Sequence, residues 1–306
     1  MEFAVALLRW LQMAGATILF GSSLFFLYAL PMTGSGSAAN LRWSRSLVAA
    51  GALAILIGCL LGFFAQTAVL ADSWPDAMTP DALNGALGMS FGRSSLVRGV
   101  TAVAAIAALL VMRPGRAAWW SGVVTGAIAC ASFAWMGHGA ATEGPGGLLH
   151  LASDVLHTWA AGVWIGALVV FLALLISRSH PANHQTLYHA LHGFSGIGSA
   201  LVAVLVATGL VNSWFVIGLA GVPQLWTAAY GQLLTIKVAL FLVMVGLAAA
   251  NRFILTPRLR AAVDTGSSSE SAIGALRRSL AMETGLSILV LGLVAWFGAL
   301  APPSVP

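Results

Sequence analysis

Long uninterrupted apolar runs are the feature that most limits the folds open to this chain. Several runs exceed the about 20 residues that an α-helix needs to cross the hydrocarbon core of a bilayer. Of the 306 residues, 59% are hydrophobic and only 8% are charged, whereas ordinary soluble domains carry about 25% charged residues. The runs lack the alternation with period two that the strands of membrane barrels require. The sequence therefore predicts an all-α, polytopic membrane protein.

Segments rich in Gly, Pro, Ser and charge divide the apolar sequence into eight predicted membrane helices. Between the second and third, residues 80–89 predict a short surface helix, because Pro80 and Asp81 form a good helical start. Residues 178–193 and those after Asn251 are interpreted as loops. We divide the chain at 147/148 into two halves, 1–147 and 148–306, of one integrated membrane unit. The predicted membrane helices cover residues 3–30, 46–71, 95–112, 117–136, 148–177, 194–220, 230–251 and 279–300.

The distribution of basic residues predicts the orientation in the membrane. Cytoplasmic loops carry an excess of Lys and Arg, and one side of the predicted topology holds ten of the fourteen basic residues. Both termini and the turn at 137–147 then face the periplasm. The net charge of +5 reflects this loop placement and does not indicate nucleic-acid binding. The first helix lacks a basic leader and a cleavage site, so we expect it to be retained. The ten residues are Arg42, Arg45, Arg113, Arg116, Arg178, Arg252, Arg258, Arg260, Arg277 and Arg278.

Side chains that can bind metals are concentrated between residues 136 and 168. His150, Asp154 and His157 follow one another at i, i+4 and i+7 on the predicted fifth helix, within roughly 60° of one helical face. Two imidazoles and a carboxylate in this arrangement favour a metal site. A haem site, a proton relay, and hydrogen bonds that only join two helices remain open as alternatives. His138 and Glu143 in the preceding turn, and the Met136 thioether, are further candidate ligands.

Ionisable groups within membrane helices are costly and are candidates for function by default. We interpret Asn251, Arg252 and Glu283 as a possible inner path near the cytoplasmic side. Glu283 would either pair with a nearby arginine or serve as an ion or proton station. Arg98 and Lys237 are expected to extend their charged ends toward the membrane surface. Cys59 and Cys130 form no CxxC motif; we expect small buried side chains, with a soft copper ligand as the alternative.

Eight motifs follow one another along the chain: RWLQMAGATILFG at 9–21, FGRSSLVR at 91–98, GHG at 137–139, LLHLASDVLHTWAAGVWIGAL at 148–168, FSGIG at 194–198, YGQLLTIK at 230–237, NRFILTP at 251–257 and RRSLAMETGL at 277–286. In this order and spacing they resemble the CopD/PcoD family of bacterial inner-membrane copper-resistance proteins. The resemblance covers nearly the whole chain, and residues from 148 on resemble the shared CopD domain most closely. The central histidines of the family pattern correspond to His138, His150 and His157.

The resemblance implies a role in copper homeostasis rather than catalysis. Copper, as Cu(I) or Cu(II), would bind on the periplasmic side and move across the inner membrane toward the cytoplasm. The implied partner is a periplasmic CopC-type copper carrier, in addition to membrane lipid. Two alternatives remain: a copper-binding sensor or scaffold that transports nothing, and a haem protein with His138 and His157 as axial ligands.

Overall fold

The computed structural model describes residues 1–30, 37–136, 144, 146–176, 182–219, 221–264 and 270–298. Within these residues all regular structure is helical, and eight helices are long and apolar enough to cross a membrane. The predicted all-α class and the number of membrane helices are confirmed. The long helices are α1 (Glu2–Tyr28), α2 (Arg42–Leu70), α5 (Ser90–Val111), α6 (Arg116–Ala131), α8 (Gly147–Ile176), α9 (Ala182–Ile217), α10 (Ala229–Ala250) and α12 (Glu270–Phe297).

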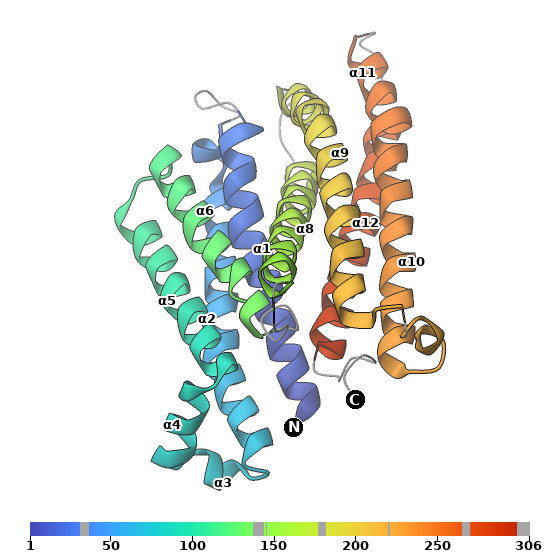
Figure 1. Ribbon diagram of the computed structural model, residues 1–306. Coiled ribbons are helices and arrows are strands. Elements are labelled where there is room, and N and C mark those ends of the chain that lie inside the picture. Colours follow the sequence, from blue (N-terminus) through green and yellow to red (C-terminus); the bar gives the residue numbers. More distant parts are fainter. Residues whose placement is uncertain are drawn as a thin grey trace.

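Helices α1 and α8 form the centre of the bundle (Figure 1). Helix α1 packs against α2, α6, α8 and α12, while α8 also contacts α9 and α12. Helix α10 packs mainly against α12 and is the least enclosed of the eight spans. The first half of the chain thus gathers around α1, and α9, α10 and α12 complete the bundle beside α8.

The crossing of α1 and α8 depends on glycines that bring the two backbones together. Gly21 lies against Gly162 and Gly166, which are four residues apart on α8. A Cβ atom added to Gly166 would lie 2.3 Å from the carbonyl carbon of Gly21. Lipid tails are as apolar as leucine side chains, so burying a side chain between two membrane helices gains little hydrophobic free energy. Close packing of the backbones is therefore a main source of helix association in lipid.

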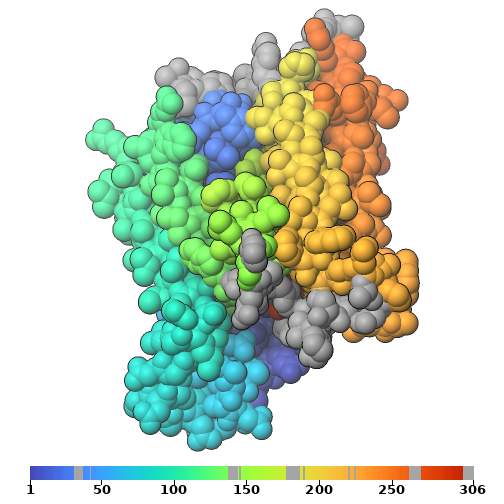
Figure 2. Space-filling view, in the orientation of Figure 1, coloured from blue at the N-terminus to red at the C-terminus, as the bar shows by residue number. Residues whose placement is uncertain are grey.

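The short elements lie mostly at the ends of the bundle. The predicted surface helix at 80–89 is confirmed as α4 (Pro80–Gly88), whose Ala82 N–H donates to the Thr79 hydroxyl at 3.4 Å. Together with α3 (Trp74–Ala77), α4 forms a lobe that projects from the end where α1 begins and α12 finishes (Figure 2). The basic-rich α11 (Thr256–Asp264) lies at the opposite end, as the predicted topology requires.

The prediction of loops at 178–193 and after Asn251 is wrong for residues 182–193, 252–264 and 270–278, where the described chain is helical. Helix α9 begins at Ala182, twelve residues before the predicted start, and carries an exposed His192 ring stacked on Tyr188 at 5.9 Å. After α10, the π-helical segment η4 (Asn251–Leu255) leads directly into α11. Pro257 near the start of α11 has no N–H for an α-helical bond, and a π-turn accommodates such a break. The remaining short elements are η1 (Ala38–Asn40), η2 (Ala134–Met136) and η3 (Val222–Leu225).

Candidate functional site

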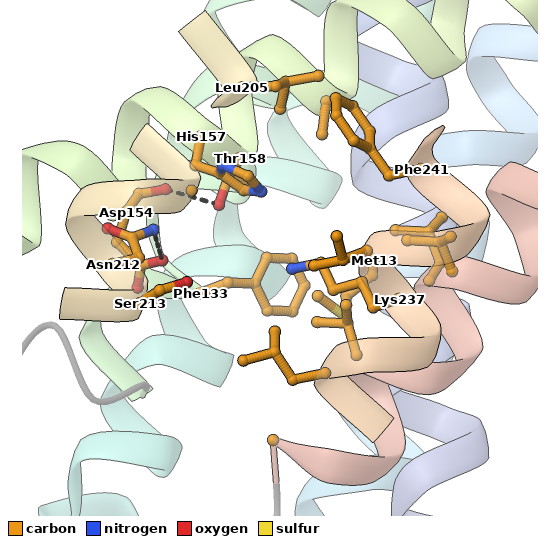
Figure 3. Close-up of a pocket in the computed structure, with 18 of the residues that line it drawn as sticks. Met13, Phe133, Asp154, His157, Thr158, Leu205, Asn212, Ser213, Lys237 and Phe241 are labelled. Carbon is orange, nitrogen blue, oxygen red and sulfur yellow. Dashed lines mark hydrogen bonds between the residues drawn. The ribbon is translucent and has the colours of Figure 1, made fainter. Parts of the chain in front are cut away.

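A cavity of about 490 Å³ lies among α1, α8, α9, α10 and α12. Its walls are mostly apolar, but the three predicted residues of α8, His150, Asp154 and His157, all line it. Figure 3 shows Asp154 and His157 on one wall and Lys237 of α10 reaching in from the opposite one. A buried pocket with a few convergent polar groups is the usual form of a small-ligand site.

The His157 ring is oriented by a hydroxyl on α9. Its Nδ1 lies 2.9 Å from Thr208 Oγ1, and this hydroxyl donates its own proton to the Val204 carbonyl at 2.6 Å. Thr208 therefore accepts from Nδ1–H, which leaves the lone pair of the neutral imidazole on Nε2. Gly209 lies beside the ring, and an added Cβ there would make an ordinary contact of 3.7 Å with His157 Cε1. The arrangement prepares Nε2 as a metal ligand.

Asp154 is joined to the same face of α9. Its Oδ1 accepts from Asn212 Nδ2 at 3.2 Å, and Asn212 Oδ1 is buried without a hydrogen-bond partner. Both residues line the cavity. An unpaired buried acceptor is costly, so the cavity offers a cation or a donor one carboxylate and one free amide oxygen.

His150 lies nearer the start of α8 and is almost fully buried, with 2% of its surface exposed. Its ring stacks on Phe215 of α9, with centroids 4.8 Å apart and planes 10° from parallel. The predicted helical face is therefore confirmed as the face that packs against α9. Among the described residues, however, no three His, Cys, Asp or Glu side chains lie close enough together to hold one metal ion.

The remaining predicted ligands do not join this group in the described part of the chain. His138 and Glu143 lie outside the described residues. The Met136 sulfur accepts from Arg98 Nη2 at 2.9 Å, so its thioether is engaged by the first half of the chain.

Arg98 does not extend to the membrane surface as expected, because it is 1% exposed. Its Nε donates to Gln12 Oε1 at 2.9 Å and its Nη1 to Ser132 Oγ at 3.1 Å. The guanidinium lies 4.4 Å from the centroid of the Phe133 ring. These neutral partners satisfy its donors inside the bundle, so Arg98 joins α5 to α1 and to the end of α6.

Sequence reasoning missed four residues that shape the cavity. Thr208 and Asn212 orient His157 and Asp154. The available signal was their i, i+4 spacing, which places them on one face of the helix. Lys237 was expected at the membrane surface, but it lines the cavity. Tyr230, at the start of α10, also lines it. Met13 of α1 is a further lining residue.

A second buried carboxylate lies deeper in the bundle. Glu283 is 1% exposed; its two oxygens accept from Trp164 Nε1 at 2.8 Å and from Asn251 Nδ2 at 3.0 Å. Asn251 is 7% exposed and its Oδ1 has no partner. Arg252 turns away and donates to the Ser195 carbonyl and to the Ser199 hydroxyl of α9. The structure thus brings together two of the three residues of the predicted inner path.

The fold and these two polar sites define the class: a multi-pass α-helical membrane protein with ligand-type side chains buried between its helices. The profile described as "Copper resistance protein D-like, N-terminal domain" matches residues 1–148, and that described as "Copper resistance protein D" matches residues 188–297. The chain is similar to "Copper resistance protein D" of Pseudomonas syringae pv. tomato, with 36% identity over 93% of this chain and 92% of the relative. It belongs to the copper resistance protein D family.

Two further relatives extend the comparison. "Inner membrane protein YebZ" of Escherichia coli (strain K12) is 27% identical over 85% of this chain and 87% of the relative. "Copper transport protein CutJ" of Bacillus subtilis (strain 168) is 32% identical, over 56% of this chain and 29% of the relative. No solved structure matches the chain significantly.

Proposed function

We propose that this protein binds copper from the periplasmic side in the cavity beside α8 and moves it across the inner membrane toward the cytoplasm. The observation that carries the proposal is the His157 imidazole, which Thr208 holds so that Nε2 keeps its lone pair, on the wall of the cavity that also carries Asp154. Imidazole and carboxylate groups suit copper. The names of two relatives, a copper resistance protein and a copper transport protein, support copper as the cargo.

A site for transfer must bind its ion tightly enough to capture it and weakly enough to release it. Incomplete coordination meets this requirement, because a histidine and a carboxylate leave copper positions open for a carrier's ligand or for the next station. The donor of the copper would be a periplasmic CopC-type carrier, and the protein would act without catalysing a reaction. The carrier would dock at the end of the bundle where α1 begins, which is also the end that carries the α3–α4 lobe.

The onward path leads from the cavity to Glu283. Ser287 lines the cavity and lies one turn along α12 from Glu283, to whose carbonyl its hydroxyl donates at 2.8 Å. Glu283 with the free Asn251 Oδ1 then offers a cation two oxygen ligands nearer the basic end of the bundle. Arg252 would lie where the ion leaves the Glu283–Asn251 site toward the cytoplasm, without contacting Glu283.

Replacing Glu283 with glutamine is expected to slow transport while leaving capture intact. Glutamine keeps the size of the side chain and an oxygen for Trp164, but it removes the negative charge that attracts a cation. We expect copper bound per protein to stay near the wild-type value and copper uptake into proteoliposomes to fall about tenfold, the effect of about 1.4 kcal/mol. Glu270→Gln, at the exposed start of α12, is the matched control. Unchanged uptake in Glu283→Gln would remove this station from the path.

The whole proposal is tested by measuring metal content and transport on one preparation. The purified protein is assayed for copper, zinc and haem, then reconstituted in sealed liposomes, and copper uptake is followed. Bound copper with uptake supports the proposal. Bound copper without uptake indicates the sensor or scaffold, while bound haem with a Soret band indicates the haem protein. Either of the last two outcomes overturns the transport proposal.

A further inference from the structure

The charges around the cavity do not favour a multiply charged cation. The described charged residues that line it are Asp154, Lys237 and Arg9. With neutral histidines these sum to one positive charge. An ion that enters therefore meets a net positive wall in a largely apolar environment, where charges interact more strongly than in water.

Lys237 is the charge best placed to act on an ion beside His157. It is the one lysine in the 306-residue sequence, and it projects from α10 into the cavity opposite Asp154 and His157 (Figure 3). Its ammonium nitrogen lies 5.8 Å from the centroid of the Phe297 ring. A cation held by His157 would feel the same positive charge.

Sulfur donors also line the cavity, beside the oxygen donors already described. The thioethers of Met13 and Met244 and the thiol of Cys130 line it together with the two imidazoles. Cys130 is fully buried, and its sulfur faces Gly162 of α8, where an added Cβ would lie 3.7 Å away. Sulfur donors select Cu(I) over the harder divalent ions.

From these two observations we infer that the cavity accepts copper as Cu(I), and that Lys237 is a specificity residue that excludes divalent cations. The inference rests on the proposed function and names the form of its substrate. Coulomb repulsion is proportional to the charge of the ion, so Lys237 opposes a divalent ion twice as strongly as a monovalent one. Asp154 compensates one of the two positive charges of Lys237 and Arg9, and the charge that remains repels a divalent ion twice as strongly as a monovalent one.

The test compares Lys237→Leu with wild type in nanodiscs. Leucine removes the charge without adding a metal ligand. Affinity for Cu(I) is measured anaerobically in the presence of a reductant, by competition with a chromophoric chelator. Affinities for Ag(I) and Zn(II) are measured by equilibrium dialysis. We expect wild type to bind Cu(I) and Ag(I) more tightly than Zn(II). Lys237→Leu should bind Ag(I) about tenfold and Zn(II) about 100-fold more tightly than wild type does, because the logarithm of the change in affinity is proportional to the charge of the ion.

Two controls keep the result interpretable. Lys237→Arg keeps the charge and should retain the wild-type preference. Arg278→Leu removes an exposed charge near the start of α12, the end far from Phe297, and should change neither the Ag(I) nor the Zn(II) affinity. The inference is overturned if Lys237→Leu raises the affinities for Ag(I) and Zn(II) by equal factors, or if wild type binds Zn(II) as tightly as Cu(I). Either result leaves copper binding in place. Wild type that binds no Cu(I) would overturn the proposed function and this inference together.

Discussion

Replacing His157 with alanine is expected to lower copper uptake into sealed proteoliposomes by at least about tenfold. Loss of a group that merely orients a metal ligand costs about 10- to 100-fold in affinity, and loss of the ligand itself should cost no less. The effect is large because a network through Thr208 and Val204 prepares the free nitrogen of the His157 imidazole. Uptake and copper content should both fall, which separates this variant from Glu283→Gln.

His192→Ala is the matched control for this experiment. It removes an imidazole from an exposed site near the other end of α9, where the ring stacks on Tyr188, and it should leave uptake unchanged. Thr208→Val provides a second comparison, because it keeps the side-chain shape but leaves Nδ1 without its acceptor. We expect a smaller loss than for His157→Ala. Full uptake in His157→Ala would place the copper site elsewhere.

The largest effect on stability is expected for Gly166→Leu. The added side chain points at the backbone of Gly21, where even a Cβ atom would lie 2.3 Å from a carbonyl carbon. Backbone cannot move aside as the end of a flexible side chain can, so α1 and α8 must separate. Overpacking usually costs about 1–3 kcal/mol, and we expect a loss at or above the upper end of this range.

The measurement is the yield of monodisperse protein and its unfolding temperature in detergent. Gly246→Leu makes the same substitution on α10 at a position with no neighbouring atom within 4 Å of an added Cβ, and it should behave like wild type. A Gly166→Leu protein of normal yield and melting temperature would show that the crossing of α1 and α8 is looser than the structure indicates.

Much of the architecture was predictable because the bilayer restricts it. Apolar runs of membrane-spanning length must be helical, since lipid satisfies no backbone hydrogen bond. The eight helices and the short surface helix α4 followed from this rule and from Pro80. The helical continuations that were missed, the first turns of α9 and the segment η4–α11, carry more polar and charged residues than the spans they extend. Outside the hydrocarbon region, composition no longer separates a helix from a loop.

The candidate site was partly predictable for a similar reason. The i, i+4, i+7 spacing places His150, Asp154 and His157 on one face whatever the helix packs against. Their partners could not be predicted, because Thr208, Asn212 and Lys237 come from helices far away in the sequence. Nothing local distinguishes a lysine that extends to the membrane surface from one that faces a cavity.

The sequence by itself determined that this chain crosses the membrane as helices, where its polar residues fall along each helix, and which family it resembles. Only the tertiary structure decided which polar residues meet. Arg98 found neutral partners inside the first half, and Glu283 found Trp164 and Asn251 instead of an arginine. The physical reason is that spacing along a helix fixes direction around its axis, whereas contact between helices depends on how closely their backbones approach. In this bundle that approach is set by the glycines at the crossing of α1 and α8.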